Sequence, residues 1–240
     1  PRAPIRPIRL NSARLAAELN APLMASSVLP LTYRKPFIEH PVGTEIREAV
    51  VAGYGGMDAY AFHSLEILQC MLERRKGGET GVASVQCLTG KAVYEAGKAG
   101  LFSMDLAEAA SAMAKRKRGA SMEAAESNPV AILIRYRDGT RGTVLLVGRY
   151  VDEYWGYATR IGDKIEACEF VTPPEPVMSY FSYLGLNIEQ LFLTGKVPWP
   201  QERTLLTTGT LSFALESRYQ KKRLETPELN VTYRPPKDWV

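Results

Sequence analysis

The sequence has few of the residues that build disulfide or metal sites. Its 240 residues include three cysteines, Cys70, Cys87 and Cys168, and two histidines. Because the cysteines are odd in number and widely separated, they exclude a disulfide framework and a zinc site of paired cysteines. We expect buried thiols, no metal and a reducing compartment, the cytoplasm, while an export signal upstream of Pro1 stays open.

Long hydrophobic runs and a strong net charge are also absent. No stretch approaches the roughly 20 apolar residues that a membrane-spanning helix needs, and the formal net charge is +4. The basic run at residues 115–118 lacks interleaved aromatic residues and is typical of a solvated helix end. The sequence therefore predicts neither a membrane span nor a nucleic-acid partner.

A glycine-rich phosphate loop after a strand is missing as well. The first seven residues contain three prolines and no methionine, and we interpret Pro1 as a cut inside a longer protein. With 45% hydrophobic residues, the chain is long enough to bury one large core.

The most informative stretch is residues 53–66, where a glycine-rich turn runs into an amphipathic helix. His63 and Glu66 share one face of that helix because they are three residues apart. A histidine near a helix start is a candidate acid or base, and a partnered structural histidine is the alternative. Asp58 is a second candidate, but an aspartate after two glycines is also typical of an N-cap.

The remaining pattern predicts an α+β fold, with a mainly antiparallel sheet and helices on one face. Asp138-Gly139 marks a hairpin turn between two strands. The predicted strands are residues 81–88, 130–136, 143–150, 154–160 and 164–171, after a leading helix and strand at 8–20 and 22–27. The predicted helices are a short one at 43–51, an exposed alanine-rich excursion at 91–117, and two at 177–193 and 202–219.

Aromatic residues gather on the later strands. The open face of the sheet, lined in part by Tyr150, Tyr154, Trp155 and Tyr157, is interpreted as either an interface or a substrate wall. Aromatic rings stack on the apolar faces of sugars, and they also pack within sheets.

Three stretches resemble the Gfo/Idh/MocA oxidoreductases, the family of glucose-fructose oxidoreductase and inositol dehydrogenase. Residues 53–66 resemble its glycine-glycine, aspartate, histidine segment, residues 19–27 its last nucleotide-domain strand, and residues 200–209 its C-terminal helix. With residues 216–219, they occur in the family's order along nearly the whole chain.

The resemblance implies an NAD(P)-dependent oxidoreductase that transfers a hydride to or from a sugar or polyol. Residues 1–30 would be a remnant of the nucleotide-binding domain, and residues 31–240 the substrate-binding and oligomerisation domain. The family's histidine at the place of His63 helps move the proton of the substrate hydroxyl. Its aspartate corresponds to Ala59, so Asp58 lies one residue early. The catalytic lysine would precede Pro1, and we expect this chain alone to be inactive.

The resemblance also suggests substrate contacts. Tyr60 and Glu66 are candidates beside His63, and Arg34 and Lys35 are candidates in the connector between domains, where they are alternatively solvated loop charges. The cofactor would be NAD or NADP, with no binding residue assignable in this chain. We expect a homo-oligomer through the sheet face. The alternative function is a non-catalytic ligand-binding or dimerisation module that uses this face.

Overall fold

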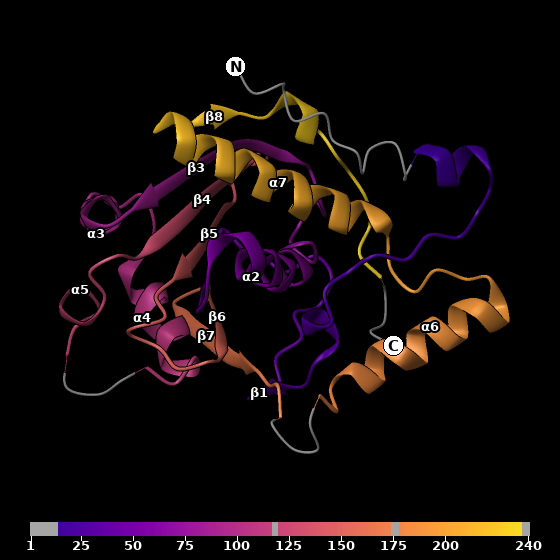
Figure 1. The fold of residues 1–240 in the computed structure, drawn as a ribbon, viewed down its shortest axis with the longest axis horizontal. Coiled ribbons are helices and arrows are strands. Elements are labelled where there is room, and N and C mark those ends of the chain that lie inside the picture. Colours follow the sequence, from indigo (N-terminus) through magenta and orange to yellow (C-terminus); the bar gives the residue numbers. More distant parts are fainter. Residues whose placement is uncertain (1–13, 117–119, 174–177, 237–240) are drawn as a thin grey trace.

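The computed structural model describes residues 14–116, 120–173 and 178–236. The first part of the predicted helix at 8–20 and the end of the basic run at 115–118 lie outside these ranges. Within these ranges the chain forms one eight-stranded sheet in the order β1-β7-β6-β2-β5-β4-β3-β8 (Figure 1). The strands are β1 (Arg34–Lys35), β2 (Glu48–Gly53), β3 (Val82–Thr89), β4 (Val130–Tyr136), β5 (Arg141–Leu146), β6 (Trp155–Ile161), β7 (Lys164–Phe170) and β8 (Leu224–Glu225). Every pair is antiparallel except β2 with β5, so the mainly antiparallel α+β prediction is confirmed.

The predicted hairpin forms at its turn residues, and a second hairpin joins β6 to β7. Asp138-Gly139 connects β4 to β5, with Gly139 at a φ of 89°, and β6 is followed directly by β7. The strand β2, which lies between these two hairpins in the sheet, was not predicted. Residues 43–51 were expected to form a helix, and this is wrong, because β2 lies at the centre of the sheet between β5 and β6. All six of its residues are buried, so its apolar run lacks the alternation of a half-exposed strand.

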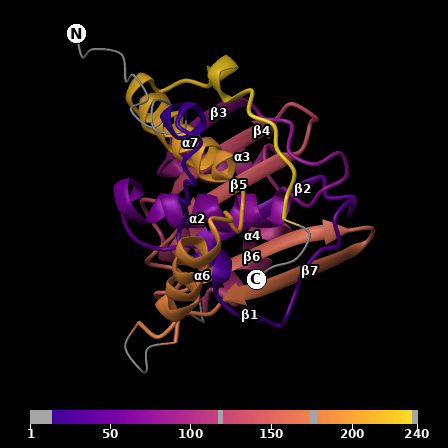
Figure 2. The same ribbon diagram turned by 90° about the vertical axis from the view of Figure 1, so that its right-hand side faces the viewer.

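Helices cover both faces of the sheet rather than the single face predicted. On one face lie α2 (Met57–Leu72) and α7 (Gln201–Gln220), which share a core with Val51, Ile132 and Tyr157. On the other lie α3 (Lys91–Lys98), α4 (Met104–Met113) and α5 (Met122–Ala125). Figure 2 looks onto the sheet from the side of α2 and α7, with α3 and α4 behind it.

The second helical layer corrects two expectations. Residues 91–117 are not an exposed excursion, because Leu106 and Ala110 are buried against the sheet. A Cβ at Gly156 would overlap the carbonyl oxygen of Ala110, so α4 packs directly on the backbone of β6. The sheet face proposed for dimerisation is therefore covered where α4 lies. The aromatic residues also divide between the faces, with Tyr150 under α4 and Trp155 on the α2 side.

The leading segment is helical at residues 14–18, and the predicted strand at 22–27 pairs with no strand among the described residues. It contacts the N-terminal end of α7 instead, where the Thr204 hydroxyl, and the Trp199 Nε1 just before the helix, donate hydrogen bonds to the Ala25 carbonyl. The short 3-10 turns η1 (Leu29–Leu31) and η2 (Pro227–Leu229) follow this segment and β8 respectively. Among the described helices none has the length and apolar character to cross a membrane.

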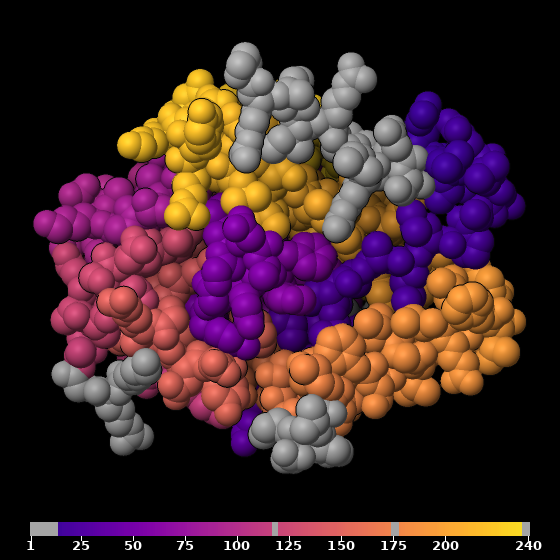
Figure 3. All heavy atoms as spheres, viewed as in Figure 1, coloured from indigo at the N-terminus to yellow at the C-terminus, as the bar shows by residue number. Residues whose placement is uncertain are grey.

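The helix α6 (Phe181–Thr194) differs from the others because it stands at one end of the molecule, opposite α3 and α5 (Figure 1). It ends at Gly195, which is in the left-handed conformation. Asn187 is its one buried side chain within the described part of the helix. In Figure 3 its orange atoms form this end of the surface.

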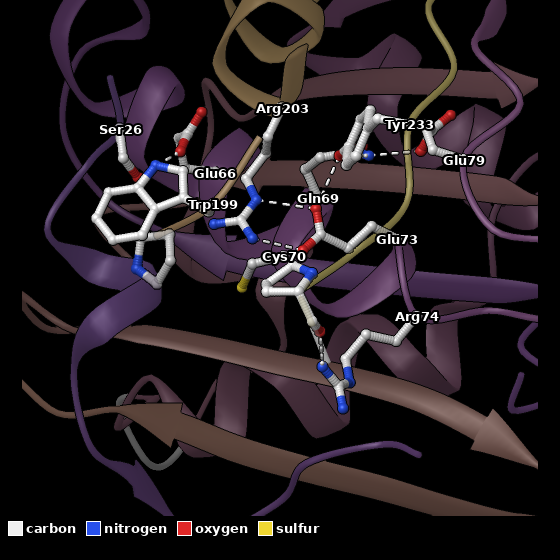
Figure 4. A network of polar contacts seen from close by, with 12 residues as sticks. Ser26, Glu66, Gln69, Cys70, Glu73, Arg74, Glu79, Trp199, Arg203 and Tyr233 are labelled. Atoms are coloured by element: carbon white, nitrogen blue, oxygen red, sulfur yellow. Dashed lines mark hydrogen bonds and ion pairs between the residues drawn. The ribbon is translucent and has the colours of Figure 1, made fainter. Parts of the chain in front are cut away.

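A buried polar network fixes the C-terminal end of α2 (Figure 4). The Arg203 guanidinium on α7 donates two hydrogen bonds to the Glu73 carboxylate, at 2.8 and 2.5 Å. Both side chains have no exposed area. The Tyr233 hydroxyl donates a third hydrogen bond to Glu73 at 2.8 Å, and Gln69 donates to the Tyr233 oxygen at 2.7 Å. This network holds α2, α7 and the C-terminal segment together.

Candidate functional site

The turn between β2 and α2 brings several candidate residues to one place. β2 ends at Gly53, and α2 begins after Gly56, whose backbone is extended. Gly55 has a φ of 81°, and a Cβ there would overlap the ring of Tyr60. Glycine is therefore required at position 55 both for its conformation and for the close packing of Tyr60.

His63 lies on the second turn of α2 with a half-buried ring. Its Nδ1 is 2.7 Å from the Ser27 hydroxyl oxygen. Its Nε2 has no hydrogen-bond partner in the part of the chain that the structure describes. Burial lowers the pKa of this imidazole below its usual value, which favours the neutral ring at pH 7. One nitrogen is thus held by the protein, and the other has no protein partner among the described residues.

Aromatic rings surround this imidazole. The ring centroid of His63 lies 6.4 Å from that of Tyr60 and 6.2 Å from that of Trp155, both edge-on, and 5.8 Å from that of Phe62. Tyr60 and Trp155 are stacked at an interplanar angle of 18°. Tyr54 packs against both, at 4.9 and 4.6 Å. Trp155, one of the aromatic residues predicted to line the sheet face, therefore lies beside His63.

The two carboxylates proposed to support His63 lie elsewhere. Asp58 is exposed on the first turn of α2. The N-cap is Gly56, which makes no side-chain capping bond, so the capping interpretation of Asp58 is wrong. Neither Asp58 nor Glu66 hydrogen-bonds the imidazole among the described residues.

Glu66 is fully buried beneath the segment that carries Ser27. Its carboxylate accepts hydrogen bonds from the Ser26 hydroxyl at 2.9 Å, the Ser27 amide at 3.4 Å and the Thr207 hydroxyl at 2.5 Å. Figure 4 shows Ser26 and Glu66 side by side. Glu66 therefore acts on His63 through Ser27. No local pattern pointed to Ser27, which is 36 residues away along the chain.

The connector residues belong to a different region. Arg34 is buried on β1, with its guanidinium 5.2 Å from the centroid of Phe170 and donating to the Pro30 carbonyl. The expectation of a solvated charge is thus wrong for Arg34, whereas Lys35 is exposed.

The second histidine, His40, is also buried in this region. Its Nε2 lies 3.3 Å from the Tyr157 hydroxyl, and its Nδ1 lies 3.5 Å from the half-exposed Glu166 carboxylate. Burial, followed by the charges of Arg34 and Arg74, lowers the pKa of His40 to about 4. His40 is therefore neutral at pH 7 and has a packing role.

A surface cavity of about 680 Å³ lies between residues 16–23 and 195–202. It is lined in part by Trp199, Glu202 and Arg234. None of the predicted site residues lines it. The chemistry of the site therefore rests on the His63 surroundings and not on this cavity.

Sequence comparison gives no match for this chain. A scan against protein-family models and a search of curated proteins both find none.

Comparison with solved structures finds distant similarity to dehydrogenases. One is a myo-inositol dehydrogenase from Corynebacterium glutamicum, at 11% identity and a TM-score of 0.43, covering 75% of this chain and 56% of the other. A scyllo-inositol dehydrogenase from Lactobacillus casei, with bound NAD(H) and scyllo-inositol, gives the same four values. GenD2 from gentamicin A biosynthesis, in complex with NAD, matches at 13% identity and a TM-score of 0.47, covering 91% of this chain and 60% of the other.

The chain spans less than two thirds of the length of these proteins. At these values the similarity is distant, and a function has to be inferred from the site residues themselves.

Proposed function

We propose that the chain is the substrate-binding part of an NAD(P)-dependent oxidoreductase that acts on a sugar or polyol. Residues 31–240 would form this part, and residues 1–30 would belong to the nucleotide-binding part. In this proposal His63 contacts the oxygen of the carbon that is oxidised or reduced, and Tyr60, which is exposed, lines the ring of the substrate, while the buried Trp155 supports Tyr60 from behind.

The observation that carries the proposal is the state of the His63 ring. One nitrogen is held by Ser27, the other has no partner among the described residues, and aromatic rings lie on its sides. A purely structural histidine buries both nitrogens in hydrogen bonds, as His40 largely does with Tyr157 and Glu166. An imidazole beside aromatic rings suits a ligand with both hydroxyl groups and apolar ring faces.

The β2–α2 turn does not fit the phosphates of a dinucleotide. The turn at Gly55 is packed against the Tyr60 ring, so its backbone does not form an open cradle. NAD or NADP thus enters the proposal through the sequence resemblance alone, and it would be held by another part of the protein. We expect the 240-residue chain to bind polyol without turning it over.

The first test is calorimetric titration of this chain with myo-inositol. The His63→Gln variant should weaken binding at least tenfold, about 1.4 kcal/mol, because it removes the ring that faces the ligand. Glu95→Gln, an exposed change on α3 beyond the sheet, is the matched control and should bind as the wild type does. Equal affinities for wild type and His63→Gln would contradict the proposal, as would the absence of binding.

A specific observation favours self-association as a second function. Apolar side chains are exposed along α6, where Phe192 is 83% and Leu193 72% exposed. The other exposed apolar residues of this helix are Phe181, Tyr183, Leu186 and Ile188. Monomeric proteins seldom expose contiguous apolar patches of large size, so this helix suits a contact with a second copy better than the covered sheet face does.

Light scattering tests this second function. The wild type should have the mass of a dimer, and a Phe192→Lys, Leu193→Lys double variant should have that of a monomer. A wild-type monomer mass across the accessible concentrations would rule this function out.

A further inference from the structure

We infer that Ser27 is a positioning residue that fixes the tautomer of His63, with the ring proton on Nε2. His63 then presents an N–H donor to an oxygen atom of the ligand. The direction of the hydrogen bond between Ser27 and His63 follows from the other contacts of Ser27. That His63 donates to a ligand rests on the proposed function.

The hydrogen bonds of Ser27 define which atom donates. Its hydroxyl oxygen already accepts a hydrogen bond from the Leu29 amide at 3.1 Å. The remaining partner of this hydroxyl among the described residues is Nδ1 of His63, at 2.7 Å. A serine hydroxyl has one proton to donate, and Nδ1 is the acceptor available for it.

The opposite tautomer leaves a buried group unsatisfied. If Nδ1 carried the ring proton, the Ser27 oxygen would accept from both Leu29 and His63, and its own proton would have no acceptor among the described residues. Ser27 is only 3% exposed, so water is a poor substitute. Buried donors without acceptors are unfavourable, and the structure therefore favours the Nε2–H form.

Ser27 is itself held firmly in place. Its amide donates to the Glu66 carboxylate at 3.4 Å. Glu66 is in turn fixed by Thr207 on α7. The buried carboxylate thus explains why α2 carries an acidic residue one turn beyond His63. It orients the serine that orients the imidazole.

The tautomer limits what the neutral ring can bind. Because the Nδ1 lone pair is occupied by Ser27 and Nε2 carries a proton, the ring faces the ligand as a donor. A carbonyl, carboxylate or hydroxyl oxygen is a suitable partner, and an ammonium group is not. The neutral His63 therefore suits a keto sugar or the ketone formed when a polyol is oxidised, because the reacting carbonyl oxygen only accepts hydrogen bonds.

The test is nitrogen-15 NMR of the histidine rings in the ligand-free 240-residue chain at pH 7.5. The protein has two histidines, so the spectrum of His63→Gln identifies the signals of His63. In the wild type, Nδ1 and Nε2 of His63 should have the widely separated shifts of one pure tautomer with the proton on Nε2. In Ser27→Ala the separation should shrink towards that of a mixture, because Nδ1 has lost its donor.

Two control variants separate this role from general disturbance of the segment. Ser27→Thr retains the hydroxyl and should restore the wild-type separation. Ser26→Ala removes the neighbouring hydroxyl, which bonds Glu66 and not His63, and should leave the separation unchanged. A wild-type proton on Nδ1, or equal separations in wild type and Ser27→Ala, would overturn the inference.

Addition of myo-inositol distinguishes failure of this inference from failure of the proposed function. The proton should stay on Nε2 when the polyol binds, and a switch to Nδ1 would overturn the donor role. If the polyol does not bind, the proposed function fails, while the tautomer in the ligand-free chain still tests the role of Ser27.

Discussion

Arg203→Met should lower the free energy of unfolding by about 3–5 kcal/mol, because it leaves the buried Glu73 carboxylate without its counter-ion. Both side chains have no exposed area, and the two hydrogen bonds between them hold α7 against α2. Burial, the largest single cause, lowers the pKa of Arg203, but the charge and hydrogen bonds of Glu73, together with Tyr233 and Cys70, raise it overall. Burial also raises the pKa of Glu73, and the two short hydrogen bonds between the side chains favour the ion pair. Urea denaturation followed by circular dichroism measures the loss.

Two further variants show whether the loss comes from an unpaired charge. The Glu73→Leu, Arg203→Met double variant should be less destabilised than the sum of its single changes, since neither charge remains. Arg223→Met breaks an ion pair with Glu225 whose members are 61% and 68% exposed, and should have little effect. If Arg203→Met is no more damaging than Arg223→Met, the described network does not stabilise the fold.

Acidification from pH 6.5 to about 4 should remove about 3 kcal/mol of stability through His40. The native pKa of about 4 lies below the unfolded value of 6.5, so in this interval the unfolded chain binds more protons. The contribution is therefore complete above pH 6.5 and declines as the pH falls. Burial, Arg34 and Arg74 cause the shift, and the nearby Glu166 opposes it.

The His40→Asn variant isolates this contribution. Urea denaturation at pH 7 and pH 4.5 should give a smaller difference for the variant than for the wild type, because carboxylates titrate similarly in both. The pKa of His63 is also lowered by burial, so His63→Gln should reduce the difference as well. If the free energy of unfolding changes between pH 7 and pH 4.5 by the same amount in His40→Asn as in the wild type, His40 is not held neutral.

The elements predictable from sequence are those with a local signal. Spaced apolar residues specify α2, and Asp138-Gly139 specifies the β4–β5 hairpin, because neighbours in the chain determine both. β2 lacks such a signal, since burial on both faces removes the alternation that identifies a strand. The helix α4 was predicted as part of the helical stretch at residues 91–117, but it was expected to be exposed and is buried against the sheet. Its backbone at Ala110 and Ala114 packs directly against Gly156, a contact that only the folded chain reveals.

The candidate site likewise contains residues that the sequence identifies and residues that only the folded chain brings in. His63 and its glycine turn are local and were identified from sequence, whereas the serine on Nδ1 comes from 36 residues away and Trp155 from β6. Glu66 shares the helix face of His63 but bonds Ser26 and Thr207 instead. Spacing on a helix shows which residues share a face, and the partners on other elements decide what they bind.

The most direct test of the account follows the two histidine rings by NMR while the chain is titrated with myo-inositol. The account predicts that the resonances of His63 move with a saturable dependence on polyol, and that those of the buried His40 do not move. Stationary His63 resonances at the highest polyol concentration, or equal movement of both histidines, would contradict it.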